Sequence, residues 1–279
     1  MLKVTRSLLL CIGVFAPLIC VSFAPIASAQ TESTLDKIKR TGVFLAGIRY
    51  DYPPVGSVDD AGKPTGFGPA LAKIFADKLG VKVQYVQVTS KTRIPLLQNG
   101  SIDADIGPTT PTVERNQVVD FTIPYVWDGA SFVVRKGSSV NIKDYGPPKK
   151  IATVQGSQFV NYVKELVPNA EFVIFQEYPE ALTALNNHKV DAVATNHFSG
   201  VTYTKKYPDL VVGNDYFKDP WAIGIRQDDT KWRNFLNFTM QEMWKSGEYQ
   251  KLFAQYFDEA PAFHMWSEFR LQPGIGGVD

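Results

Sequence analysis

Cysteine is almost absent from this chain of 279 residues, which contains only two, Cys11 and Cys20. Both lie within the first thirty residues, in a segment with the character of a secretion signal. A mature chain without this segment has no cysteine. It therefore has no disulfide framework, no thiolate metal site and no cysteine nucleophile.

The N-terminal segment has the three parts of a secretory signal peptide. A positive start at Lys3 and Arg6 precedes an apolar run from Leu8 to about Pro25, and small residues follow at 27–29. The apolar run is short for a membrane-spanning helix, which needs about 20 residues. We therefore predict that residues 1–29 are a cleaved signal peptide and that the protein is periplasmic. A retained signal anchor is the alternative.

Clustered charge and histidine are also scarce. Without residues 1–29 the chain carries 27 basic and 28 acidic side chains, a net charge of −1. This balance gives no sign of nucleic acid or a membrane surface as partner, since both recognise clustered basic charge. The three histidines lack metal-ligand spacing, and neither G-x-S-x-G nor H-E-x-x-H occurs. We therefore expect no metal, no cofactor and no catalytic residue.

Strand-like and helix-like patterns alternate along the chain, and the same order occurs twice. The first unit has expected strands at 43–46, 81–86 and 104–106, with helices at 70–79 and from a cap at Ser90 or Thr92 through Leu97. The second has expected strands at 150–154, 172–175 and 190–194, with helices at 159–166 and 179–185. Two further helices are expected at 230–245 and 248–257. This alternation predicts an α/β fold with parallel sheets in two lobes of similar build.

Three polar stretches carry the functional signal. They read G-I-R-Y-D-Y-P-P at 47–54, T-S-K-T-R-I-P-L-L-Q-N-G at 89–100 and D-A-D-I-G-P-T-T-P-T-V-E-R at 103–115. In sequence and separation they resemble the motifs of the periplasmic solute-binding proteins for polar amino acids. The resemblance is closest to the branch that binds glutamate and aspartate, and it covers nearly the whole mature chain.

This resemblance implies the two-lobed fold of a type II-like periplasmic binding protein. Each lobe would contain a parallel-rich sheet flanked by helices, and two strand-like crossovers would let the lobes close on a ligand between them. Lobe 1 would comprise residues 30–127 and 221–262, lobe 2 residues 128–220, and the C-terminal tail residues 263–279. The crossovers would lie near 125–130 and 216–220.

The resemblance also assigns ligand contacts in the first lobe. Arg115, helped by Thr110, would hold the ligand's α-carboxylate, because a guanidinium grips a carboxylate through two parallel hydrogen bonds. Arg49, Ser90 and Arg93 would surround a second carboxylate. The alternative is that these arginines are solvated side chains on exposed loops.

Further contacts are implied by aromatic residues and by the second lobe. The aromatic rings of Tyr50, Tyr52 and Tyr125 would form walls against the ligand. Ser157, in the loop Q-G-S-Q at 155–158, would donate a hydrogen bond from the start of a helix, a natural site for anions. A plain helix cap is the alternative role for Ser157.

Two positions depart from the family pattern. Asn196 stands where members that bind α-amino acids usually have an aspartate or glutamate, and Pro108 stands where branch members commonly have a serine. With three arginines and no facing acid, the sequence favours a doubly anionic ligand without an amine. If the ligand does carry an amine, an acid outside the identified contacts, for example Asp51 or Asp128, would neutralise it.

Together these patterns predict a non-enzymatic binding protein for an ABC importer. It would be a monomer that binds a polar or acidic amino acid, or a related carboxylate, and delivers it to a permease in the inner membrane. A dehydratase-like enzyme and a dicarboxylate or modified amino-acid receptor on the same scaffold are the alternatives. A sensory ligand-binding module is a further one.

Overall fold

The computed structural model describes residues 32–258. The predicted signal peptide at 1–29 and the predicted tail at 263–279 lie outside the described residues. None of the helices within residues 32–258 is both long enough and apolar enough to cross a membrane.

The first sheet brings together strands from the two ends of the chain. Its order is β5-β1-β6-β14-β7, with bounds β1 Val43–Arg49, β5 Lys82–Val88, β6 Ala104–Asp105, β7 Val119–Phe121 and β14 Gly224–Arg226. β1 is parallel to β5 and β6, whereas β14 is antiparallel to its neighbours. We call the part of the chain built on this sheet lobe 1.

Helices from both ends of the chain pack on lobe 1. They are α1 Thr34–Thr41, α2 Phe67–Leu79, α3 Arg93–Gln98, α7 Thr230–Ser246 and α8 Glu248–Ala254. α2 packs on β1 and β5, and α3 packs on β6, β7 and β14. A small sheet of β2 Asp51–Tyr52, β3 Gly56–Val58 and β4 Pro64–Thr65, and the 3-10 turn η1 Arg115–Gln117, complete the lobe.

The second sheet has the order β10-β9-β11-β8-β12. Its strands are β8 Val126–Arg135, β9 Lys150–Val154, β10 Glu171–Phe175, β11 Ala192–Asn196 and β12 Leu210–Val212, and β13 Phe217–Trp221 pairs with β8. Its helices are α4 Phe159–Leu166, α5 Tyr178–Asn186 and α6 His197–Thr204, with the 3-10 turn η2 Ile142–Asp144. We call this part lobe 2.

The two sheets share one topology. In each, the first three parallel strands stand in the order second, first, third, and an antiparallel strand separates the third from the fourth. That antiparallel strand is β14 in lobe 1 and β8 in lobe 2. The repeated pattern in the sequence therefore corresponds to a repeated fold, as predicted.

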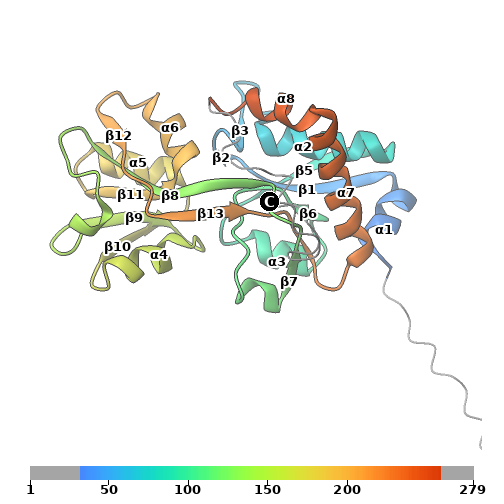
Figure 1. Ribbon diagram of the computed structural model, residues 1–279, viewed down its shortest axis with the longest axis horizontal. Helices are drawn as coiled ribbons and strands as arrows, with labels where there is room; N and C mark the ends of the chain where they lie inside the picture. The colour runs from blue at the N-terminus through green and yellow to red at the C-terminus, as the bar shows by residue number, and fades with distance from the viewer. Residues whose placement is uncertain (1–31, 259–279) are drawn as a thin grey trace, which may run out of the picture. The chain divides into compact units, whose positions relative to one another are not determined.

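The segments expected to connect the lobes lie in β8 and β13. These strands pair antiparallel over five residues, from Phe217 opposite Ala130 to Trp221 opposite Val126, and Figure 1 shows them side by side. Both connections are extended and hydrogen-bonded to each other, which suits a two-stranded hinge. We propose that the lobe boundaries follow these strands, at 127/128 and 220/221.

The C-terminal helices attach to lobe 1 through a buried tryptophan. Trp232 of α7 packs edge-on against Phe44 of β1, with ring centroids 5.4 Å apart, and its indole N–H donates to the carbonyl of Asp103 at 3.0 Å. Both rings are fully buried. Burying Phe44 alone contributes about 1.5–3 kcal/mol, and this contact fixes the end of the chain to its beginning.

The loops expected to bind ligand follow the carboxyl ends of parallel strands. Ser90 follows β5, Pro108 follows β6 and Ser157 follows β9, while Arg49 and Asn196 end β1 and β11. In parallel α/β sheets the carboxyl ends of strands form the ligand-binding edge. The topology therefore places the predicted ligand contacts of each lobe at the ligand-binding edge of that lobe's sheet.

Candidate ligand-binding site

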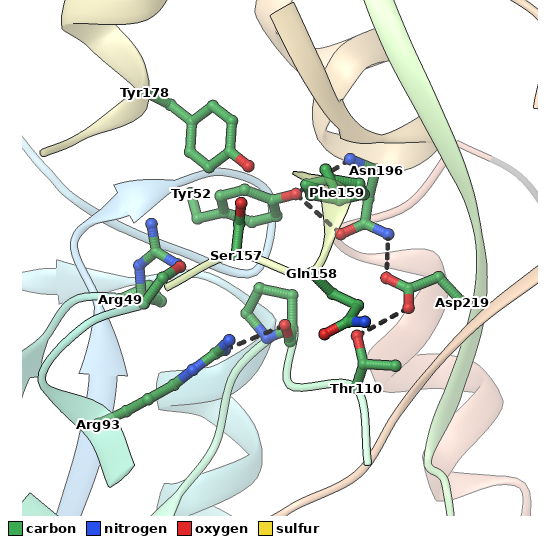
Figure 2. A pocket seen from close by; sticks show the side chains of 12 residues that line it. Arg49, Tyr52, Arg93, Thr110, Ser157, Gln158, Phe159, Tyr178, Asn196 and Asp219 are labelled. Carbon is green, nitrogen blue, oxygen red and sulfur yellow. Dashed lines mark hydrogen bonds between the residues drawn. The ribbon is translucent and has the colours of Figure 1, made fainter. Parts of the chain in front are cut away.

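A small polar cavity lies where the loops of the two lobes meet (Figure 2). Eight of the eleven residues that the sequence assigns to the ligand site line it: Arg49, Tyr52, Ser90, Arg93, Pro108, Thr110, Ser157 and Asn196. Gln158, Phe159, Tyr178 and Asp219 complete the lining. The space left at the centre is about 10 Å³, about enough for one water molecule. Ligand entry therefore requires the lining side chains to move apart.

Arg49 forms an ion pair with Asp51, two residues later in the chain. Its Nε and Nη2 donate to the two carboxylate oxygens of Asp51, both at 2.7 Å, and its Nη1 donates to Ser90 Oγ at 2.6 Å. Both members of the ion pair are buried. Burial lowers the pKa of Arg49, but Asp51 more than offsets it, so the pKa is raised overall. The expectation that no acid faces the arginines is wrong for Arg49.

Arg93 retains free donor capacity. Its Nη1 donates to the carbonyl of Pro108 at 3.1 Å and to Thr109 Oγ1 at 2.5 Å, while its buried Nε has no partner within residues 32–258. Burial, followed by the nearby charge of Arg115, lowers the pKa of Arg93 to about 9. The guanidinium is still charged at neutral pH.

Asp105 is the acid connected to Arg93. Thr109 Oγ1 bridges the two, since it donates to Asp105 Oδ2 at 2.6 Å. Burial raises the pKa of Asp105, and Arg93 opposes this rise. The carboxylate does not line the cavity, so Arg93 remains the cationic group that the cavity exposes on this side.

Arg115, the predicted partner of the α-carboxylate, is not in the cavity lining. Its Nη1 donates to the carbonyl of Thr110 at 2.7 Å and its Nη2 donates to the carbonyl of Gly156 at 3.1 Å. Thr110 belongs to lobe 1 and Gly156 to lobe 2, so this guanidinium bridges the lobes. Burial lowers its pKa. In this closed form, protein carbonyls occupy donors that a ligand carboxylate could take.

The loop after β9 approaches lobe 1 closely. Gly156 has φ +80°, and a Cβ at this position would lie 2.7 Å from the carbonyl oxygen of Ser90, so only glycine fits without displacing the loop. Ser157 Oγ lies 3.0 Å from Thr153 Oγ1 and two residues before the first residue of α4. Ser157 lines the cavity near the start of α4, as expected from the sequence.

Tyr52 joins lobe 1 to the end of β11 in lobe 2. Its hydroxyl donates to Asn196 Oδ1 at 2.8 Å, accepts from the backbone N–H of Asn196 at 3.1 Å and lies 3.0 Å from Thr195 Oγ1. Its ring packs edge-on against Tyr178 at 4.9 Å and lies 5.1 Å from the Arg49 guanidinium carbon. Tyr52 therefore forms both a wall of the cavity and a contact that holds it shut.

The other predicted aromatic walls lie elsewhere. Tyr125 is fully buried beside Phe67 and donates its hydroxyl to the carbonyl of Gly107 at 2.8 Å. Tyr50 packs against the hydrophobic core and is not among the lining residues. Tyr178, together with Tyr52, is an aromatic wall of the cavity instead.

Asn196 and Asp219 form a direct contact at the hinge side of the cavity (Figure 2). Asn196 Nδ2 donates to Asp219 Oδ2 at 2.6 Å, while Thr110 Oγ1 and the Tyr162 hydroxyl donate to Asp219 Oδ1 at 2.7 and 3.1 Å. Asp219 is 2% exposed. Burial raises its pKa, and these hydrogen bonds partly oppose the rise.

Four lining residues were not predicted from the sequence: Asp219, Gln158, Phe159 and Tyr178. The pairing of Asp51 with Arg49 was not predicted either. Gln158 and Phe159 adjoin the predicted Ser157, and Tyr178 lies just beyond the carboxyl end of β10. Asp219 lies in the segment expected to be the second crossover. The signal available in the sequence was an acid within that strand-like segment.

Within residues 32–258, no group of three His, Cys, Asp or Glu side chains is arranged to hold a metal ion. The cavity instead combines guanidinium, hydroxyl, amide and carboxylate groups from both lobes. Such a set can hold a small zwitterionic or anionic molecule through charge-assisted hydrogen bonds.

The chain is similar in sequence to curated transport proteins. The ABC transporter glutamine-binding protein GlnH of Bacillus subtilis (strain 168) is 32% identical over 254 residues, covering 87% of this chain and 92% of the relative. A glutamine-binding protein of Geobacillus stearothermophilus is 37% identical over 207 residues, covering 72% and 79%.

Solved structures agree with the fold. The crystal structure of the ancestral amino acid-binding protein AncCDT-1, a precursor of cyclohexadienyl dehydratase, superposes with a TM-score of 0.76 at 33% identity. The match covers 81% of this chain and 100% of that one. The predicted fold class, two α/β lobes with parallel-rich sheets, is confirmed. Residues 44–259 match the family of bacterial extracellular solute-binding proteins, family 3, and the chain belongs to that family.

Proposed function

We propose that this chain is the extracytoplasmic substrate-binding component of an ABC importer and that it binds a polar or acidic amino acid between its lobes. The observation that carries the proposal is the buried polar cavity, in which charged groups of both lobes face one another. Buried charge is costly unless it is paired, and a bound zwitterion supplies partners. The two relatives named for glutamine support a ligand of this class.

The ligand's α-carboxylate would bind beside Thr110. Arg115 lies next to this position, and each of its terminal nitrogens now donates to a carbonyl, Thr110 O or Gly156 O. A carboxylate is a stronger acceptor than a neutral carbonyl, because charge-assisted bonds are about twice as strong. We propose that Arg115 exchanges these carbonyls for the ligand when the cleft opens and recloses.

The end of the ligand side chain would meet Arg93 and Ser90. Arg49 contributes less charge than expected, because Asp51 neutralises it. A single available guanidinium can serve either an amide oxygen or a carboxylate. We therefore propose an amino acid of the glutamine or glutamate type rather than a dicarboxylate.

Export and delivery are part of the same proposal. A cleaved signal peptide at 1–29 would release the protein into the periplasm, where it would act as a monomer and deliver its ligand to an ABC permease in the inner membrane. The family's extracellular members and the transporter name of the relative from Bacillus subtilis support this.

The chain is a binding protein rather than an enzyme, as its relatives are. Both curated relatives are named as binding proteins, and AncCDT-1 is described as an amino acid-binding protein that preceded a dehydratase. The dehydratase-like alternative is therefore not retained.

A thermal-shift screen tests the proposal. The probes are the common amino acids, C4 and C5 dicarboxylates and aromatic acids, each at millimolar concentration. Binding to the folded state raises the melting temperature by mass action. We expect one or a few polar amino acids to give the largest rise. A screen in which no amino acid raises the melting temperature while another class does would contradict the proposal.

A further inference from the structure

The family resemblance leads us to expect an acid at position 196, and the structure brings one beside that position from another strand. Asn196 ends β11, and Asp219 lies in β13, 23 residues later in the chain. The side chains touch, with Asn196 Nδ2 2.6 Å from Asp219 Oδ2. The carboxylate of Asp219 therefore lies beside the amide of Asn196, at the position where an acid was expected.

Asp219 is the one acid in the lining of the cavity within the described residues. The two acids considered from sequence are engaged elsewhere. Asp51 is paired with Arg49, and Asp128, opposite Asp219 on the neighbouring strand, accepts from the backbone N–H groups of Gly129 and Phe198. Neither carboxylate lines the cavity.

The carboxylate of Asp219 has room for one more donor. An ionised carboxylate offers about four acceptor sites, and three are used, by Thr110, Tyr162 and Asn196. All three donors are neutral groups, a hydroxyl, a phenol and an amide. A buried carboxylate held only by neutral donors gains most from a cation.

The surroundings suit a primary ammonium group. The group has three donors, and Asp219 Oδ2, the Thr110 hydroxyl and the second lone pair of the Pro108 carbonyl can accept from it. Thr110 and Pro108 line the same cavity, and Pro108 spends one lone pair on Arg93. Thr110 also lies beside Arg115, so the amine and the α-carboxylate of one amino acid would bind on adjoining sides of Thr110.

We propose that Asp219 binds the protonated α-amine of the ligand and that Asn196 is the positioning residue that holds its carboxylate. This inference rests on the proposed function and adds its missing ionic contact. It also links ligand to hinge, because Asp219 lies in β13, one of the two strands that connect the lobes. This proposal replaces the expectation of an amine-free ligand, which rested on Asn196 and on three arginines without a facing acid.

A charge-swap experiment tests the assignment. Calorimetry compares each amino acid that passes the thermal-shift screen with its amine-free analogue, for example L-glutamine with glutaramate. We expect the wild type to prefer the amine-bearing ligand. Asp219→Asn should lower affinity for that ligand at least about 30-fold and change affinity for the analogue by less than about threefold.

The swap itself is the double variant Asn196→Asp/Asp219→Asn, which returns the carboxylate to the end of β11. Its affinity for the amine-bearing ligand should be at least about tenfold higher than that of Asp219→Asn. Asn196→Asp alone places two carboxylates in contact and should weaken binding. Asp215→Asn, a partly exposed acid bound to His197, is the matched control and should leave both affinities unchanged.

Three results would overturn the assignment. They are equal wild-type affinity for the amine-bearing and amine-free ligands, equal loss for both ligands in Asp219→Asn, and a double variant no better than Asp219→Asn. A wild type that binds no amino acid at all would instead overturn the proposed function. Melting temperatures of the ligand-free variants separate misfolding from lost binding, and the recovery in the double variant does so independently.

Discussion

Arg49 and Asp51, two residues apart in the chain, form a buried bidentate ion pair whose two nitrogen–oxygen distances are both 2.7 Å. The pair belongs to lobe 1, yet Asp51 Oδ2 also accepts from the backbone N–H of Tyr178 in lobe 2 at 3.3 Å. Asp51 therefore reduces the net positive charge of the cleft and contributes to closure. The ligand meets fewer uncompensated cations than a count of arginines suggests.

Because Asp51 pairs with Arg49, we expect Arg49 and Arg93 to have different roles. Arg93 should bind the end of the ligand side chain, whereas Arg49 should stabilise the fold. Arg93→Ala should weaken binding of ligands with a second anionic or amide group by about 10- to 100-fold and should affect other ligands little. Arg49→Ala should instead leave Asp51 buried without its partner and destabilise the fold by about 3–5 kcal/mol. Calorimetry and chemical denaturation measure the two effects.

The control for this prediction removes both charges. Arg49→Ala combined with Asp51→Asn should recover part of the lost stability, because no unpaired carboxylate remains. An Arg93→Ala variant that loses every ligand equally, or an Arg49→Ala variant of normal stability, would contradict the separation.

Arg115 should be required for all amino-acid ligands. Its guanidinium reaches Thr110 from lobe 1 and Gly156 from lobe 2, where the common α-carboxylate would bind. Arg115→Ala should reduce affinity at least about 100-fold, and Arg115→Lys should restore only part of it, because a point charge cannot form the two-pronged contact. Near-normal affinity of Arg115→Ala in calorimetry would remove this residue from the site.

Binding should weaken in acid through Asp219. Burial raises the pKa of Asp219 above its ordinary value, so this carboxyl becomes neutral at a higher pH than an exposed aspartate, near 3.9, would. Affinity for an amine-bearing ligand should be fully present above the raised pKa and should fall as pH decreases through it. The amine-free analogue should show a smaller fall.

Calorimetry between pH 8 and the onset of acid unfolding measures this dependence. Asp219→Asn serves as the control and should show weak binding with little change over the same range. A wild-type affinity that stays constant while the Asp219 carboxyl titrates would argue against contact between this group and the amine.

The Tyr52 hydroxyl should contribute to holding the cleft closed. It makes hydrogen bonds to Thr195 and Asn196 across the lobes. Tyr52→Phe should lower ligand affinity about tenfold, or ~1.4 kcal/mol, and should favour the open form. Tyr85→Phe is a matched control, because Tyr85 donates to Pro69 within lobe 1 and should not alter affinity. Equal effects of the two changes would show that Tyr52 has no special part in closure.

Much of the fold was predictable because its signals are local. The helix pattern from Ala70 to Leu79 and the alternation after Gly80 reflect burial against one sheet, and the structure has a helix and a strand there. α6 was not predicted, since its buried residues include Ser199 and Gly200 and give no clear apolar stripe.

The lining of the cavity was predictable where residues belong to the motifs that carry the family resemblance, and not where a contact depends on residues outside them. Arg49, Ser90 and Arg93 converge because their loops follow neighbouring strands. The contact between Asn196 and Asp219 depends on how β13 pairs with β8, which no local pattern specifies. β13 does alternate between exposed Lys218 and buried Asp219, so the register of that strand carries the clue.

Small-angle X-ray scattering measures whether the two lobes close on a bound ligand. Scattering is recorded for the protein with and without a saturating amino acid, in the buffer where calorimetry shows full occupancy. We expect a smaller radius of gyration with ligand, because the unliganded lobes separate about β8 and β13 and the ligand holds them together. An unchanged radius of gyration at demonstrated saturation would contradict it.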